Sequence, residues 1–176
     1  MKLIIALGNP GKQYENTRHN AGFLVLDEIQ KNLDFPAFEL NAKFGALVCE
    51  KNLGGEKIIL AKPQSFMNRS GEVVKKMLDF FKIPKENLTV LHDDLDLELG
   101  KFKISLDASA GGHNGAQNII DNLNTQQFKR IRLGIEGAEK KKTRLISGEA
   151  FVLQNFSNEE LEIIKKLAEE IKNEIS

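Results

Sequence analysis

Apolar residues fall into short strand-like runs and helical stripes, and polar residues collect where each run or stripe ends. The strand-like runs cover residues 2–7, 44–50, 57–61, 88–91, 100–106 and 128–135. Helical stripes begin near Ala21, over residues 68–81, near His113 and after Ser157. Strands that alternate with helices in this way predict an α/β fold in which helices cover both faces of one sheet.

Turn and cap signals place the boundaries of these elements. The Asn52-Leu53-Gly54-Gly55 stretch predicts a hairpin, so at least one strand is antiparallel and the sheet is mixed. Asn20 fits an N-cap, and Ser157 with Glu160 forms a capping box. No repeat or linker divides the chain. We therefore expect a single domain over residues 1–176, a three-layer sandwich with a twisted, mostly parallel mixed sheet.

Composition narrows the class of protein without naming a function. The 25 basic residues balance 25 acidic ones, which argues against a general nucleic-acid sheath but leaves a local basic patch possible. No apolar run approaches the roughly 20 residues of a membrane helix, and no secretory signal is recognisable at the start. Cys49 is the single cysteine and cannot form an internal disulfide, so we expect a cytoplasmic protein with no membrane association.

The most informative polar segment, residues 9–20, follows the first strand and contains Tyr14, the only tyrosine. A second polar group, residues 92–94, follows the run 88–91. If these strands are parallel neighbours, Asn9, His19 and Asp93 meet at the rim where open α/β sheets bind ligands. His19 could then act as a base oriented by Asp93. The plainer alternatives are a surface histidine and a solvated acidic turn.

Three asparagines, Asn9, Asn68 and Asn114, lie at separate element ends. An amide donates and accepts hydrogen bonds without charge, so three converging amides suit an ester or peptide and could stabilise an oxyanion. For any one of them alone, a turn or cap residue is the better explanation. The glycine-rich stretch 111–115 resembles an anion-binding loop or a hinge and matches no nucleotide motif.

Basic residues with period-two spacing form two pairs, Lys101 with Lys103 and Arg130 with Arg132. They could make a local phosphate-binding patch or a solvated charged face. Residues 92–94, a histidine and two aspartates, admit a divalent metal. However, the histidines are far apart in sequence, with no H-x-x-H or C-x-x-C spacing, and we expect no metal.

Covalent catalysis has no support, because there is no G-x-S-x-G elbow and Cys49 sits in a strand-like run. The remaining groups, a base, an orienting acid and several amides, suit attack of water on an activated carbonyl.

Five separated segments resemble the bacterial-type peptidyl-tRNA hydrolases, in family order and over nearly the whole chain. They are Gly8-Asn9-Pro10-Gly11 with Tyr14 and residues 17–22, Lys62-Pro63 with residues 66–68 and 70–71, residues 92–96, residues 109–115, and residues 130–135. The resemblance implies a monomer, without metal or organic cofactor, that hydrolyses the ester between a peptide and the terminal ribose of tRNA.

The resemblance also implies roles for individual residues. His19 would activate water and Asp93 would orient it, while Asn9 and Asn68 would position substrate or stabilise the oxyanion. Substrate would also meet Asn114, His113, Tyr14 and Met67. The implied tRNA contacts at the acceptor end are Lys103, Arg130 and Arg132, with the CCA terminus in the cleft.

The chain departs from the family pattern at the tRNA side. Ser105 stands where many relatives have a second basic residue, and the lysine-rich stretch 137–148 reads as a loop. Two alternatives stay open: a non-catalytic RNA-binding protein of the same fold, and a generic nucleotide-binding α/β protein.

Overall fold

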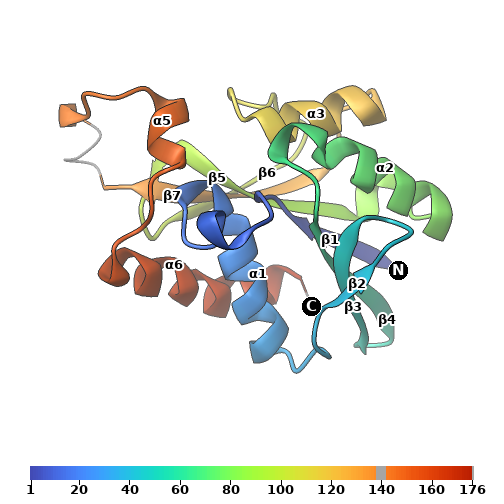
Figure 1. The fold of residues 1–176 in the computed structure, drawn as a ribbon. Helices are drawn as coiled ribbons and strands as arrows, with labels where there is room; N and C mark the ends of the chain where they lie inside the picture. Colours follow the sequence, from blue (N-terminus) through green and yellow to red (C-terminus); the bar gives the residue numbers. More distant parts are fainter. Residues whose placement is uncertain (138–141, 176) are drawn as a thin grey trace.

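The computed structural model of the protein describes residues 1–137 and 142–175. Within them, one sheet has the strand order β2-β3-β4-β1-β5-β7-β6 (Figure 1). Strands β4, β1, β5 and β7 are parallel, whereas β2, β3 and β6 pair antiparallel with their neighbours. The predicted mixed sheet is confirmed, and so is the parallel pairing of the first strand with the strand that begins at Leu88. The bounds are β1 Lys2–Ala6, β2 Glu39–Asn41, β3 Ala46–Leu53, β4 Glu56–Pro63, β5 Leu88–Glu98, β6 Phe102–Ser105 and β7 Lys129–Glu136.

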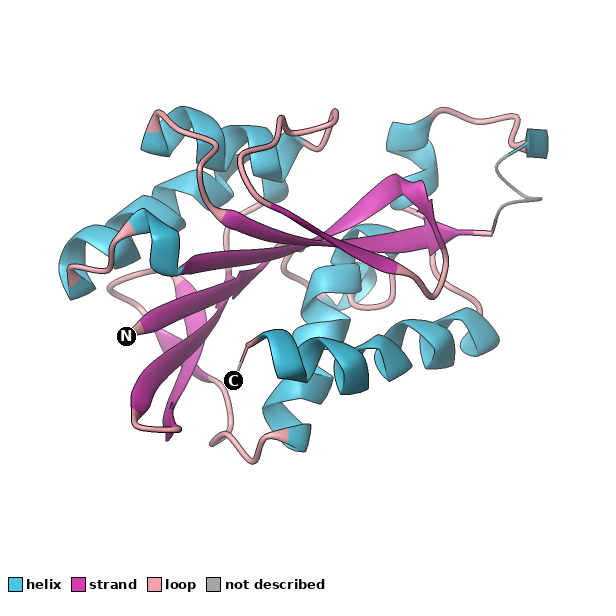
Figure 2. Ribbon diagram, turned by 180° about the vertical axis from the view of Figure 1, so that it is seen from behind, coloured by secondary structure: helices cyan, strands magenta, loops and turns pink. Residues whose placement is uncertain are grey.

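Helices cover both faces of the sheet, as predicted. Figure 2 shows the strands running between the helices of the two outer layers. The core on one face joins α1 and α6, and the core on the other face joins α2 and α3. Strand β1 serves both cores through its alternation, with Ile4 facing the first and Leu3 and Ile5 facing the second. The helices are α1 Ala21–Asn32, α2 Ser70–Phe81, α3 Asn114–Leu123, α5 Gly148–Val152 and α6 Asn158–Ile171.

Several boundaries differ from the predicted ones. Strand β5 continues past residue 91 to Glu98, because β7 pairs with it beyond that point. The side chain of Asn20 does not cap α1 and binds the backbone of Asn9 instead. The capping box at Ser157 is confirmed. The short strand β2 and the short helix α5 were not predicted. Part of the predicted loop 137–148, residues 138–141, lies outside the described residues.

A close approach at Gly22 fixes α1 against the carboxyl ends of the central strands. A Cβ at this position would lie 2.7 Å from the Leu91 carbonyl oxygen and 2.8 Å from that of Leu7, so only glycine fits without displacing backbone. The turn that precedes α1 is therefore held directly above the ends of β1 and β5. Within the described residues, no helix is long and apolar enough to cross a membrane.

Candidate active site

The predicted meeting of His19 and Asp93 occurs beyond the carboxyl end of β1, beside the middle of β5. His19 lies in a 3₁₀ turn, Arg18–Asn20, just before α1, and Asp93 lies within β5. The Nδ1 atom of His19 lies 2.9 Å from both carboxylate oxygens of Asp93. Both side chains are buried, so this contact is shielded from bulk water.

A second histidine, His113, approaches the same carboxylate. Its Nε2 lies 2.8 Å from Oδ1 of Asp93, and its Nδ1 accepts the backbone N–H of Ala116 at 3.1 Å as the N-cap of α3. Because Nδ1 accepts, the proton of the neutral ring is on Nε2, which donates to Asp93. Asp93 is therefore a shared acceptor for two imidazoles.

The same logic assigns the tautomer of His19. Its Nδ1–H donates to Asp93, which leaves the lone pair on Nε2 available to accept a proton. Burial lowers the pKa of His19, but the charge of Asp93 and the hydrogen bond to it outweigh burial and raise that pKa above its usual value. Burial raises the pKa of Asp93, but the two histidines more than reverse this, so that the carboxyl stays ionised.

The third histidine of the chain, His92, completes the cluster. Its Nδ1–H donates to the backbone oxygen of Asp93 at 2.7 Å, and its ring centroid lies 4.5 Å from that of His113. Burial and the neighbouring His113 lower its pKa well below the usual value, so His92 remains neutral. Sequence reasoning considered His92 only as a metal ligand.

Ligand atoms of His19, Asp93 and His113 lie within 4.8 Å of one another, a spacing that could suit a metal ion. A metal on Nε2 of His113 would displace the proton that this nitrogen carries. The proton could not move to Nδ1, which already accepts the Ala116 amide. The hydrogen-bond network therefore does not fit a metal centre at these atoms.

Asn9 is held by hydrogen bonds to Asn20 and Met67 that do not use its side-chain amide nitrogen. Its backbone exchanges two hydrogen bonds with the side chain of Asn20, at 2.8 and 2.9 Å. Its Oδ1 accepts the backbone N–H of Met67 at 2.9 Å, which fixes the amide orientation. In the described part of the chain its Nδ2 has no protein partner, so this N–H group is available to a ligand.

A cleft of about 570 Å³ opens over these groups. The three predicted asparagines, Asn9, Asn68 and Asn114, all line it, and so do Met67 and His113. Tyr14 is not part of its lining; it packs edge-on against the lining residue Phe66, with ring centroids 6.5 Å apart. The lining is Asn9, His19, Phe66, Met67, Asn68, Asp93, Asp94, Leu95, residues 110–114, Gly148, Glu149, Val152 and Leu153.

The basic residues predicted to bind phosphates divide into exposed and buried ones. Lys103 is exposed and lies opposite Arg132 across β6 and β7. Arg132 pairs with Asp94 at 2.5 Å and keeps about a fifth of its side chain exposed. Arg130 is 1% exposed and donates to the carbonyl oxygens of Ala108 and Ser109. The prediction that Arg130 contacts phosphates is therefore corrected: Arg130 holds the loop that precedes α3.

Helix α5 is the part of the site that sequence reasoning missed. It supplies Gly148, Glu149 and Val152 to the cleft wall. Its five residues are too few for a helical stripe to be recognised. The one local signal is Ser147, whose hydroxyl accepts the N–H of Ala150 as the N-cap.

Comparisons with known proteins agree with one another. The sequence model of the family described as peptidyl-tRNA hydrolase matches residues 3–176. The peptidyl-tRNA hydrolase of Shouchella clausii is 44% identical over 172 residues, 96% of this chain and 88% of that protein. The one of Thermoanaerobacter sp. (strain X514) is 52% identical over 140 residues, 80% of this chain and 75% of that protein. The crystal structure of peptidyl-tRNA hydrolase from Acinetobacter baumannii superposes with a TM-score of 0.86 at 28% identity, covering 99% of this chain and 86% of that one.

Proposed function

This chain belongs to the peptidyl-tRNA hydrolase family, and we propose that its cleft hydrolyses the ester between a peptide, or an N-blocked amino acid, and the terminal ribose of tRNA. The free tRNA and peptide would then be recycled after aborted translation. The observation that carries the proposal is the buried His19–Asp93 pair, with Nε2 of His19 left to accept a proton in the cleft that Asn9 also lines; the Nδ2 of Asn9 has no partner among the described residues.

The proposed reaction uses His19 twice. Its Nε2 takes a proton from water as the water oxygen attacks the ester carbonyl carbon. Asp93 stabilises the imidazolium formed, and the proton then passes to the ribose oxygen as the carbon–oxygen bond breaks. The products are a free carboxylic acid and a tRNA hydroxyl, so atoms and charge balance.

The amides act on the oxygen that becomes negative. Asn9 can donate through Nδ2, and Asn68 and Asn114 line the same cleft. Neutral donors suit this role because they stabilise a developing oxyanion without forming an ion pair with the substrate. Met67 and His113 line the remaining floor as substrate contacts, and Tyr14 supports the wall through Phe66.

The tRNA would approach over β6 and β7. Lys103 and Arg132 lie opposite each other there as a cross-strand basic pair. Arg132 is ion-paired with Asp94, which also lines the cleft. Phosphates of the acceptor end would meet this pair while the single-stranded CCA terminus reaches the cleft. We expect the protein to act as a cytoplasmic monomer that needs no cofactor.

The test is release of N-acetyl-amino acid from N-acetyl-aminoacyl-tRNA by wild type and His19→Ala, measured with and without EDTA. We expect cleavage by wild type alone and tRNA binding by both proteins, which shows that the variant is folded. Equal cleavage by the variant would remove His19 from the role of base. Binding without cleavage by either protein would instead favour a non-catalytic RNA-binding function, and loss of wild-type activity in EDTA would show a metal requirement.

A further inference from the structure

Helix α5 is held in place by contacts with two arginines and with strand β5. Two guanidinium groups lie over the ring of Phe151. The Cζ atom of Arg18 is 4.5 Å from the ring centroid, and the Cζ atom of Arg144 is 5.2 Å from it. Arg18 in turn donates to Glu160 at 2.8 Å. A Cβ on Gly148 would lie 2.6 Å from Cδ1 of Leu95, so the first turn of α5 touches β5 two residues beyond Asp93. These contacts therefore fix the position of the cleft wall that α5 forms.

Three carboxylates line the cleft, and two of them are compensated. Asp93 accepts hydrogen bonds from two histidines, and Asp94 pairs with Arg132. The third, Glu149, is exposed, and no cation among the described residues pairs with it. Among the described residues Glu149 is therefore the cleft carboxylate without an ion-pair partner; the nearby Arg144, whose Nη1 lies 3.5 Å from where a Cβ on Gly148 would be, pairs with Glu136.

The other side chains that α5 and the residue after it contribute to the cleft are apolar. Val152, Leu153 and Leu95 line the cleft with Glu149, and Leu153 is 51% exposed. A carboxylate within an apolar wall repels phosphate and does not match the RNA backbone. It does match a peptide side chain with an aliphatic stem and a cationic end, which can cover the apolar wall and reach the charge.

We propose that Glu149 is a specificity-determining residue for the peptide part of the substrate: it favours a cationic side chain over an anionic one in the amino acid esterified to tRNA. This inference rests on the proposed function. Exposed charge pairs have small effects, so we expect a preference of about fivefold in kcat/KM at low salt. The preference should shrink as salt screens the charge.

The experiment keeps the tRNA constant and varies only the amino acid. One tRNA body is charged with Nα-acetyl-lysine, Nα-acetyl-glutamine or Nα-acetyl-glutamate, and kcat/KM is measured for each at low and high salt. For wild type we expect the order lysyl, glutaminyl, glutamyl. Glu149→Gln should bring the lysyl-to-glutamyl ratio close to one, and Glu149→Lys should invert it.

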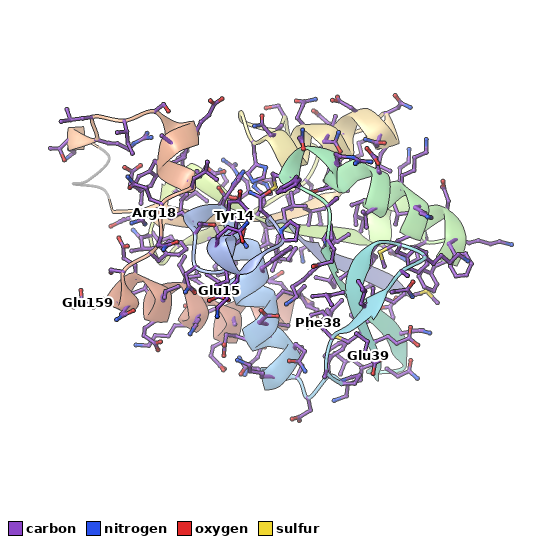
Figure 3. The ribbon with its side chains drawn as sticks, viewed as in Figure 1. Tyr14, Glu15, Arg18, Phe38, Glu39 and Glu159 are labelled. Carbon is purple, nitrogen blue, oxygen red and sulfur yellow. The ribbon has the colours of Figure 1, made fainter. Side chains whose placement is uncertain are left out.

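A matched control is Glu159→Lys. Glu159 is also exposed and also lies in the first turn of a helix, but it belongs to α6 and does not line the cleft. Figure 3 shows it at the outer end of α6. This variant changes net charge by the same amount and should keep the wild-type ratio. Using ratios cancels any general effect of added charge on tRNA binding.

The outcomes distinguish a failure of the inference about Glu149 from a failure of the proposed hydrolase function. A wild-type ratio near one, an unchanged ratio in Glu149→Lys, or an equal shift in Glu159→Lys would overturn the role of Glu149 while leaving the hydrolase function in place. Failure of wild type to cleave all three esters would overturn the proposed function, and the inference with it.

Discussion

Replacing Asp93 by asparagine should disable His19 by changing where its proton sits. An amide has one acceptor oxygen and one donor nitrogen in place of two acceptor oxygens. His113 must donate from Nε2, because its Nδ1 accepts the Ala116 amide, so it takes the single oxygen at the Oδ1 position. The amide nitrogen then occupies the Oδ2 position, 2.9 Å from Nδ1 of His19, where two donors face each other, while the oxygen at the Oδ1 position, also 2.9 Å from Nδ1, is engaged by His113.

The conflict is relieved when His19 carries its proton on Nε2 and accepts at Nδ1. That tautomer has no lone pair facing the cleft and cannot take a proton from water. A base held in the wrong tautomer loses about 10³- to 10⁴-fold in rate, and we expect kcat to fall in this range. Burial remains as the main influence on His19 once the carboxylate is gone, so its pKa should fall and the acidic limb of the residual activity should move to lower pH.

The assay is single-turnover cleavage of N-acetyl-aminoacyl-tRNA by four proteins: wild type, Asp93→Asn, His113→Ala and the double variant. Without His113 the amide oxygen can turn to His19, and the native tautomer returns. The cost of Asp93→Asn should therefore be about tenfold smaller in the His113→Ala background, a coupling of about 1.4 kcal/mol. The same cost in both backgrounds would refute the tautomer argument, even if Asp93→Asn alone were inactive.

Three further predictions concern binding and stability. Lys103→Ala should weaken tRNA binding and reduce the slope of log K against log salt by about one; an unchanged slope, or an equal change in Lys101→Ala, would place the phosphate contact elsewhere. Arg18→Met should lower the free energy of unfolding by about 3–5 kcal/mol, because it removes the guanidinium that neutralises the buried carboxylate of Glu160; a loss below about 1 kcal/mol in urea unfolding would contradict this. Gly71→Ala should destabilise by about 1–3 kcal/mol, since its Cβ would lie 2.3 Å from a backbone oxygen of α3, whereas Gly137→Ala, whose Cβ would meet no atom of the described residues within 4 Å, should cost far less.

The sequence could predict the mixed α/β sheet and the meeting of His19 with Asp93, because both follow from apolar runs that are long enough to be recognised as strands. Continuous apolar runs identify the central strands, and parallel neighbours bring their carboxyl ends together. Helix α5 could not be predicted in this way, because five residues give no recognisable period. Arg130 could not be placed either: an arginine in a strand is usually exposed, and only the fold shows that two loop carbonyls receive its guanidinium.

The adjacent aspartates of β5 have different partners, although they are neighbours in the sequence. Their spacing admits a metal pair, but successive residues of a strand point to opposite faces. Asp93 accordingly turns to His19 and His113, and Asp94 to Arg132. If the proposed function is correct, two successive residues of β5 have two different tasks. Asp93 orients the base at the ester, and Asp94 holds the basic residue that meets the phosphates. A shift of β5 relative to its neighbours β1 and β7 would disturb both together, so that catalysis and tRNA positioning depend on the register of the same strand.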